Sequence, residues 1–215
     1  MQSKYKHVIW DWNGTLFDDA DLCWQIINEI VIENNLPEVS FEKYLEVFTF
    51  PVKDYYAALG LPVENGEFER LGKIFIERYE ERKFDAELHD GAIDFVKKIN
   101  GCGIGQSVLS AYSLDKLISI LKHFGLLPYM EEIAGLDNIY AHGKIEVGKR
   151  LMEKLGLQRG EAVMIGDTLH DAEVAAEIGA DIILIANGHQ SEERLRKSGL
   201  PVVKRYSELG ESICR

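Results

Sequence analysis

The sequence predicts an α/β fold, a doubly wound parallel sheet with an α-helical cap inserted after its first strand. Two observations predict the sheet: short apolar runs alternate with amphipathic helical stretches over most of the 215 residues, and polar residues follow the runs. A third observation predicts the insert, because residues 18–84 contain helical patterns and no convincing strand. The remaining chain has the size of a normal doubly wound domain.

The expected strands are short apolar runs whose length fits a buried strand better than a helix. They are His7–Trp10, Gly105–Leu109, Ala162–Ile165 and Asp181–Ala186, with weaker candidates at Glu132–Ala134 and Pro201–Val203. The expected helices between them have apolar residues at a spacing of three and four. They are Ala92–Ile99, Leu114–His123, Val147–Leu155, Ala172–Ile178 and Glu192–Lys197.

The helical insert sets the expected domain boundaries: residues 1–17 and 85–215 form the core domain, and residues 18–84 form the cap. Aromatic residues are frequent in the insert, and we expect most of them to form its own core. Phe48 and Phe50 flank a proline-marked turn and are the expected exceptions. Stretches with helical periodicity are Leu22–Glu33, Phe41–Phe48, Asp54–Leu59 and Phe68–Tyr79.

The formal net charge of −12 argues against nucleic acid and anionic membranes as partners, because both require clusters of cations. The insert has 15 acidic and 7 basic residues, a net charge of −8, so most of the acidity belongs to it. Cys23, Cys102 and Cys214 are widely spaced and form no CxxC pair, which predicts a reducing, cytoplasmic location. No apolar stretch has the length of a membrane span. The oligomeric state, monomer or dimer, stays open.

Residues that carry chemistry follow the strands at one expected edge of the sheet. Ligands of open α/β sheets bind at the carboxyl ends of the strands. Asp11–Thr15 follow the first strand, Ser110-Ala111 follow the second and Gly166–Asp171 follow the third. A loop before a later helix adds His142–Lys144. Together these residues predict a site for a small phosphorylated molecule.

Each residue type suggests a role in phosphoryl transfer. The Asp11 carboxylate can attack phosphorus and form an aspartyl-phosphate. Ser110 can donate a hydrogen bond to a phosphoryl oxygen, and Lys144 can neutralise the transferring group. Asp11 and Asp167 can share a Mg²⁺ ion, which prefers hard oxygen ligands. Asp171 can hold a water of that ion or fix Lys144.

Three neighbouring residues are candidates for substrate binding. Gly14 permits a tight turn that brings backbone N–H groups to the phosphoryl oxygens. Ala111 follows Ser110 at the same sheet edge, and Thr15 is expected to bond to the backbone of its own loop. Asn187–His189 follow the fourth strand, where a simple loop role is the favoured interpretation.

These residues occur in an order that resembles the haloacid dehalogenase-like (HAD) superfamily, whose pattern is DxDGT, a hydroxyl residue, Lys and GDxxxD. Here the pattern is DWNGT at Asp11–Thr15, then Ser110, Lys144 and GDTLHD at Gly166–Asp171. The resemblance is of the phosphoglycolate-phosphatase-like kind and covers essentially the whole chain. It implies a Rossmann-like core, an α-helical cap over the site, and a magnesium-dependent phosphatase acting on a small phosphate ester.

The sequence departs from that pattern at Asn13, where the phosphatases have a second Asp that serves as general acid and base. An amide cannot act as a general acid or base. Loss of general acid–base catalysis lowers the reaction rate roughly 10²- to 10⁴-fold. The resemblance implies that the metal ligand here is the backbone carbonyl of Asn13, so metal binding should survive. A leaving group that needs no proton, such as an acyl phosphate or pyrophosphate, is one explanation. Proton transfer by His170 or a cap residue is another.

Two other functions stay open. Phosphonate-cleaving members of the superfamily lack the second Asp and form an imine on a cap lysine, for which Lys53 is the candidate; otherwise Lys53 could grip a substrate anion. A phosphate-binding or signalling protein with little turnover is the alternative from another class. Receiver domains also place an Asp, a hydroxyl residue and a Lys on a doubly wound sheet, but they lack the insert and the GDxxxD motif.

Overall fold

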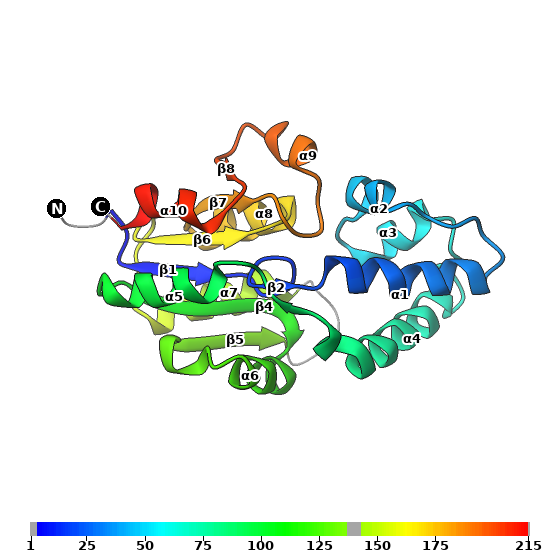
Figure 1. Cartoon of the computed structure of the whole chain (residues 1–215), viewed down its shortest axis with the longest axis horizontal. Coiled ribbons are helices and arrows are strands. Elements are labelled where there is room, and N and C mark those ends of the chain that lie inside the picture. Colours follow the sequence, from blue (N-terminus) through cyan, green and yellow to red (C-terminus); the bar gives the residue numbers. More distant parts are fainter. Residues whose placement is uncertain (1–3, 137–142, 215) are drawn as a thin grey trace.

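The computed structural model describes residues 4–136 and 143–214, which form a parallel sheet covered by helices and a helical insert at one end (Figure 1). The main sheet has the order β5-β4-β1-β6-β7-β8, and each neighbouring pair is parallel. The chain therefore starts in the middle of the sheet and extends to both edges, which confirms the predicted doubly wound α/β class. Its strands are β1 (His7–Trp10), β4 (Gly105–Ser113), β5 (Glu132–Leu136), β6 (Ala162–Gly166), β7 (Asp181–Ile185) and β8 (Val202–Val203).

Helices cover both faces of this sheet, because alternate strand residues point to opposite faces. Val8 and Trp10 pack into one hydrophobic cluster with α5, α6 and α10, whereas Ile9 packs into a second cluster with α7 and α8. The helices of this part are α5 (Ala92–Gly101), α6 (Leu114–His123), α7 (Lys144–Lys154), α8 (Leu169–Ile178), α9 (Glu192–Arg196) and α10 (Tyr206–Ile213), with the 3₁₀ turn η2 (Leu127–Tyr129).

The register of the central strands sets the level of the site. Trp10 at the end of β1 pairs with Val108 of β4 on one side and with Ile165 of β6 on the other. The residues that follow these positions therefore emerge side by side at the carboxyl edge. They are Asp11 after β1, Ser110 on β4 and Asp167 after β6.

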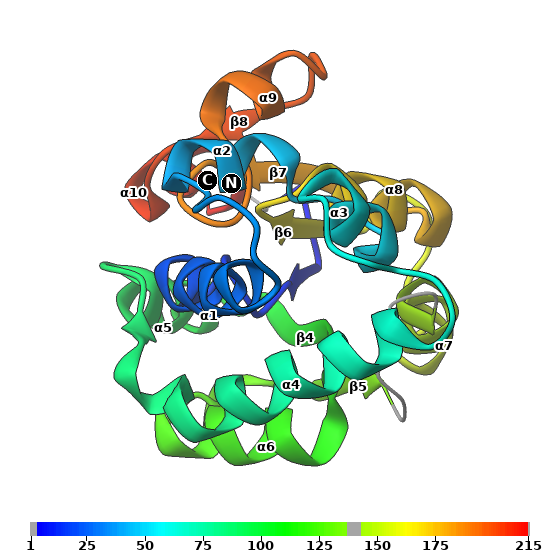
Figure 2. The same ribbon diagram turned by 90° about the vertical axis from the view of Figure 1, so that its right-hand side faces the viewer.

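The helical insert lies beyond that carboxyl edge, as the strand arrows of Figure 1 and the end-on view of Figure 2 show. Its chain leaves and returns through two short antiparallel strands that pair with each other, β2 (Phe17–Asp18) and β3 (Glu87–Leu88). The domain boundaries at 17/18 and 84/85 remain a prediction, although this strand pair lies close to both. The insert consists of α1 (Ala20–Glu33), α2 (Phe41–Val47), α3 (Val52–Ala58), α4 (Glu67–Arg82) and the 3₁₀ turn η1 (Lys83–Asp85).

Two features of the insert give it a stable form. Helices α1 and α4 pack together, and Arg78 and Arg82 of α4 both form ion pairs with Glu29 of α1, at 3.3 and 2.6 Å. Several of its aromatic residues are almost fully buried, among them Tyr44 and Tyr55, but most of them also line the cavity beside the core, which the sequence predicted only for Phe48 and Phe50. None of the helices in the described ranges is long and apolar enough to cross a membrane.

Candidate active site

The ends of β1, β4 and β6 bring the predicted acidic and hydroxyl residues to one place. Asp11, Ser110 and Asp167 are all buried, and all three line the same cavity. The Ser110 Oγ accepts a hydrogen bond from the backbone N–H of Tyr112 at 3.0 Å, which orients its hydroxyl. Ala111 lines the cavity beside it.

Lys144, the first residue of α7, ties two of the carboxylates together. Its Nζ donates to Asp11 Oδ1 at 2.5 Å and to Asp171 Oδ1 at 2.7 Å. Asp171 is fixed from the other side by a capping box, because its Oδ2 accepts from the Thr168 N–H and hydroxyl at 3.0 and 2.7 Å. The ammonium and the capping bonds outweigh the burial that opposes ionisation, so the pKa of Asp171 lies below its ordinary value.

Asp11, Asp167 and Asp171 form a compact group of oxygen donors. Each offers an oxygen within 4.8 Å of the other two. Burial, with repulsion from the other two carboxylates, raises the pKa of Asp11 to about 8 despite Lys144. Burial likewise raises the pKa of Asp167 to about 6. One ammonium is therefore too little positive charge for this group, and the donor set fits a hard divalent cation such as Mg²⁺.

Close backbone packing holds Asp167 against the loop after β1. A Cβ at Gly14 would lie 2.4 Å from Asp167 Oδ2, and one at Gly188 would lie 2.3 Å from the same oxygen. The backbone N–H of His189 donates to that oxygen at 2.6 Å. Thr15 Oγ1 donates to Asp167 Oδ1 at 3.1 Å. Only glycine fits where these two loops meet.

Asn13 turns its amide away from Asp11 and toward the insert. Its Nδ2 donates to Asp19 Oδ2 at 2.6 Å and to Tyr79 Oη at 2.7 Å, and the Tyr79 hydroxyl donates to the same Asp19 oxygen at 2.7 Å. The other Asp19 oxygen accepts from the Gly14 N–H at 2.9 Å. A buried carboxylate therefore lies directly beside the amide that replaces the usual second Asp.

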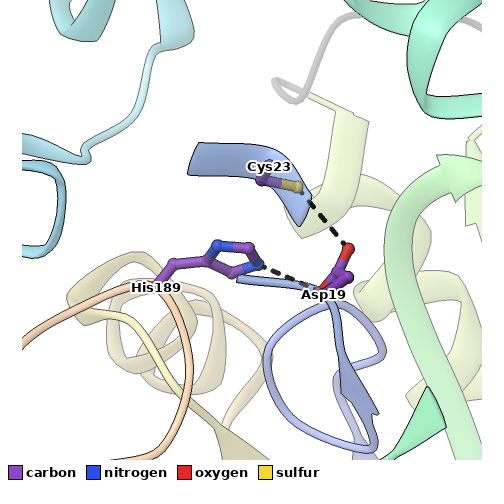
Figure 3. A group of neighbouring side chains, drawn as sticks. All are labelled: Asp19, Cys23 and His189. Carbon is purple, nitrogen blue, oxygen red and sulfur yellow. Dashed lines mark hydrogen bonds and ion pairs between the residues drawn. The ribbon is translucent and has the colours of Figure 1, made fainter. Parts of the chain in front are cut away.

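His189 and Cys23 complete the surroundings of Asp19 (Figure 3). His189 Nε2 lies 3.4 Å from Asp19 Oδ1, and the Cys23 thiol donates to Asp19 Oδ2 at 3.7 Å. Burial opposes protonation of His189, but Asp19 and the other site carboxylates outweigh it and raise the pKa of His189 to about 9. His189 also bonds through Nδ1 to the Tyr44 hydroxyl at 2.6 Å, which connects the core to α2.

Sequence reasoning missed Asp19, Tyr79 and Tyr44, and it assigned His189 to an ordinary loop. The available signals were the paired acids at Asp18 and Asp19 and the position of His189 after a strand at the correct sheet edge. Neither feature indicates which side chains contact each other in the folded protein. Phe48 and Phe50 both line the cavity, as their position beside the turn predicted.

The cavity has a volume of about 300 Å³ and lies between the sheet edge and the insert. The catalytic candidates Asp11, Ser110 and Lys144 lie on its core side, whereas side chains from α2, α3 and α4 form the opposite wall. This arrangement combines an anionic, metal-compatible floor with a mainly apolar enclosure. It suits a small molecule that carries one phosphoryl group.

Three expectations require correction. Lys53 is not among the residues that line the cavity; its Nζ forms an ion pair with Glu64 at 3.0 Å on the surface of the insert, which gives no support to an imine or an anion contact at this lysine. Thr15 bonds to the Asp167 carboxylate rather than to its loop backbone. The Gly14 N–H is already used by the Phe17 carbonyl and Asp19, so it does not point to a phosphoryl group. His142 lies outside the described residues.

Comparison with known proteins identifies the family. The model of the haloacid dehalogenase-like hydrolase family matches residues 8–185, which include every candidate residue except Asn187–His189. The chain therefore belongs to the haloacid dehalogenase-like hydrolase family. The predicted resemblance to this superfamily, and the prediction of an enzyme, are confirmed.

Individual relatives are more distant. The chain is 25% identical to the tyrosine-protein kinase PtkA of Mycobacterium tuberculosis (strain ATCC 25618 / H37Rv) over 207 residues, covering 95% of this chain and 70% of that protein. It is 24% identical to the phosphoglycolate phosphatase of Caulobacter vibrioides over 193 residues, covering 86% and 81%. A haloacid dehalogenase-like family hydrolase from Streptococcus pneumoniae has the same fold, with a TM-score of 0.80, 16% identity and coverage of 96% and 97%.

Proposed function

We propose that the protein is a magnesium-dependent phosphatase that hydrolyses a small phosphomonoester through an aspartyl-phosphate on Asp11. The observation that carries this proposal is the contact of Lys144 with both Asp11 and Asp171 at the base of the cavity. A buried carboxylate held by a fixed ammonium is a suitable nucleophile for phosphorus. The family membership and the phosphatase among the relatives support the same reaction.

The reaction has two steps. In the first, an Asp11 oxygen attacks phosphorus, the bond from phosphorus to the ester oxygen breaks, and its electron pair leaves with the alcohol oxygen, which takes a proton from solvent. Ser110 and Lys144, on the core side of the cavity, stabilise the charge on the transferring phosphoryl oxygens. In the second, water attacks phosphorus, the bond between Asp11 and phosphorus breaks with its electron pair returning to the carboxylate, and inorganic phosphate leaves with the water's oxygen while one proton passes to solvent. Asp11 is thereby regenerated.

Magnesium would be held by the carboxylates of Asp11 and Asp167, with the backbone carbonyl of Asn13 as a further ligand and Asp171 behind them. When bound, it supplies positive charge for the phosphoryl oxygens and offsets the repulsion among the carboxylates. The raised pKa values of Asp11 and Asp167 support this assignment, because they reflect negative charge that the described residues leave uncompensated.

We further propose that the helical insert acts as a cap that excludes water and contacts the alcohol part of the substrate. Asn13 lacks proton chemistry, so alcohols that are weak acids should leave slowly. We expect the protein to act on soluble small molecules in the cytoplasm.

The test is phosphate release from a panel of metabolite and synthetic phosphate esters with Mg²⁺ and with EDTA. Asp11→Asn should abolish release, whereas Asp94→Asn, which changes an exposed carboxylate on α5, should leave it intact. Undiminished activity of Asp11→Asn would refute the nucleophile. A stable phosphorylated Asp11 without turnover would instead indicate a phosphate-binding or signalling protein.

A further inference from the structure

The walls of the cavity are aromatic and are fixed before a ligand enters. The Phe48 ring centroid lies 5.5 Å from that of Phe50 and 5.2 Å from that of Tyr55, in both cases edge to face. Such contacts hold the rings in defined orientations and leave flat apolar surface toward the cavity. Eight aromatic residues of the insert line it: Tyr44, Phe48, Phe50, Tyr55, Tyr56, Phe68, Phe75 and Tyr79.

The hydroxyl groups of the lining are mostly committed to the protein. Tyr79 donates to Asp19, and Tyr112 donates to Glu80. A substrate with several hydroxyl groups, such as a sugar, therefore finds few partners here. Within the described part of the chain, two buried polar atoms of lining residues have no partner, Tyr55 Oη and His170 Nε2. They suit a ligand with a single polar substituent.

The lining also lacks a cation that is free to receive a second anionic group. Among the described residues that line the cavity, the cationic groups are the ammonium groups of Lys116 and Lys144 and the imidazole of His189, which already pairs with a buried carboxylate at 3.4 Å. Lys144 is held by two carboxylates, and Lys116 pairs with Glu80 at 3.3 Å. Glu69 and Glu80 add negative charge on the insert side. A carboxylate or a second phosphate on the alcohol part would therefore be repelled.

The departure at Asn13 points to the same kind of substrate. Asn13 supplies no proton to the ester oxygen, so a leaving group that is stable as an anion is favoured. A phenol has a pKa of about 10, well below the value of about 15.7 for water, so a phenolate leaves readily without a proton. An aromatic alcohol thus satisfies both the shape of the walls and the missing acid.

From these observations we propose that the cavity selects phosphate monoesters of aromatic alcohols that carry no second anionic group. This inference rests on the phosphatase activity proposed above and specifies its substrate. Asp11 attacks phosphorus, the phosphorus–oxygen bond to the ring breaks, and the electron pair leaves with the phenolate, which takes its proton from solvent. The ring of the substrate lies against Phe75 and its neighbours.

The first test compares matched substrates of the wild-type enzyme with Mg²⁺. We expect kcat/KM for phenyl phosphate and 2-naphthyl phosphate to exceed that for phosphoglycolate and glycerol phosphate by at least about 100-fold, from apolar contact and leaving-group acidity together. Faster hydrolysis of phosphoglycolate or glycerol phosphate would overturn the substrate class and leave the phosphatase activity standing.

A binding measurement separates the pocket from the chemistry. Benzylphosphonate and 3-phosphonopropionate mimic phenyl phosphate and phosphoglycolate but cannot be hydrolysed. Calorimetric titration should show at least about tenfold tighter binding of benzylphosphonate, since burying a ring is favourable and burying an unpaired carboxylate is not. If no ester is hydrolysed but this preference holds, the proposed function falls and the ligand class stands. Equal or reversed affinities would overturn the ligand class.

A pair of variants tests the wall directly. Phe75→Arg places a cation in the lining, whereas Phe84→Arg makes the same change at a half-exposed residue outside it. Phe75→Arg should lower kcat/KM for phenyl phosphate at least about tenfold and raise it for phosphoglycolate. Phe84→Arg should change neither value. Phe75→Leu, which keeps the wall apolar, should retain the preference even if Phe75→Arg folds poorly. No change in Phe75→Arg would refute the role of this wall.

Discussion

The contact between Asn13 and Asp19 predicts a large, pH-dependent effect of restoring the usual carboxylate. In Asn13→Asp, an oxygen replaces an Nδ2 that now lies 2.6 Å from Asp19 Oδ2. Two unit charges at that separation repel each other by about 6 kcal/mol at an effective dielectric constant near 20. We therefore expect Asn13→Asp to lower the free energy of unfolding by about 6 kcal/mol at pH 8.

The effect should shrink as the pH falls, because the pair can share one proton. Proton sharing raises the pKa of one of the two carboxyl groups in the folded state. A raised carboxyl pKa lowers the free energy of unfolding progressively as the pH rises above the unfolded-state pKa of about 3.9. At pH 5 the cost of that proton is only about 1.5 kcal/mol. Urea unfolding of wild type and Asn13→Asp at both pH values measures the difference.

The exchange variant Asn13→Asp/Asp19→Asn keeps one amide against one carboxylate and serves as the control. It should recover at least half of the lost stability at pH 8, although it gives up the ion pair with His189. Asn13→Asp alone should also raise the turnover of phenyl phosphate roughly tenfold, because base help for hydrolysis of the aspartyl-phosphate returns. Equal stability of wild type and Asn13→Asp at pH 8 would refute the contact.

Three further predictions follow from the described contacts. Asp171→Asn should lower the free energy of unfolding by about 1 to 3 kcal/mol and reduce kcat at least about 100-fold, because Lys144 and the start of α8 both lose a charged partner. Burial lowers the pKa of His7 to about 4. The free energy of unfolding of the wild type should therefore fall by up to ~2 kcal/mol as the pH is lowered from 6.5 to 4. Urea unfolding should show no such loss for His7→Gln. Mg²⁺ should raise the Tm of wild type by differential scanning fluorimetry and raise that of Asp11→Asn less.

Each of these has a result that contradicts it. Full activity of Asp171→Asn, with Asp115→Asn on α6 as the surface control, would mean that Lys144 needs only Asp11. An unchanged acid profile in His7→Gln would assign the acid sensitivity to other groups. An unchanged Tm of the wild type after addition of Mg²⁺ would argue against the proposed magnesium site.

Much of the core and its floor could be predicted because both depend on local patterns. Apolar runs locate the strands, and the ends of parallel strands share an edge, so Asp11, Ser110 and Asp167 had to meet. The helix bounds differ mainly at the ends: α7 begins at Lys144 and α8 at Leu169, each earlier than its apolar pattern indicates. The first turns of these two helices are mostly polar, so the spacing of apolar residues does not reveal where the helices begin.

The insert side of the site could not be predicted in the same way. Asp19, Tyr79 and His189 come from separate segments, and their hydrogen bonds depend on how the insert packs against the core. Lys53 lies outside the cavity lining for a related reason: its position beside a turn does not indicate which side of the insert its side chain and Glu64 occupy. Helix α10 was missed because its apolar residues are few, yet its Leu209 is fully buried.

One carboxylate in this fold performs two tasks at once. Oδ2 of Asp171 closes the first turn of α8, while its Oδ1 holds the Lys144 ammonium. If the first turn of α8 unfolds, Asp171 therefore no longer holds the Lys144 ammonium in place, and the ion pair between Lys144 and Asp11 is weakened as well. Folding and reactivity are therefore coupled through a single side chain. If Asp11 is the nucleophile, as proposed, a molecule in which α8 is unfolded should be inactive even when the rest of the site is intact.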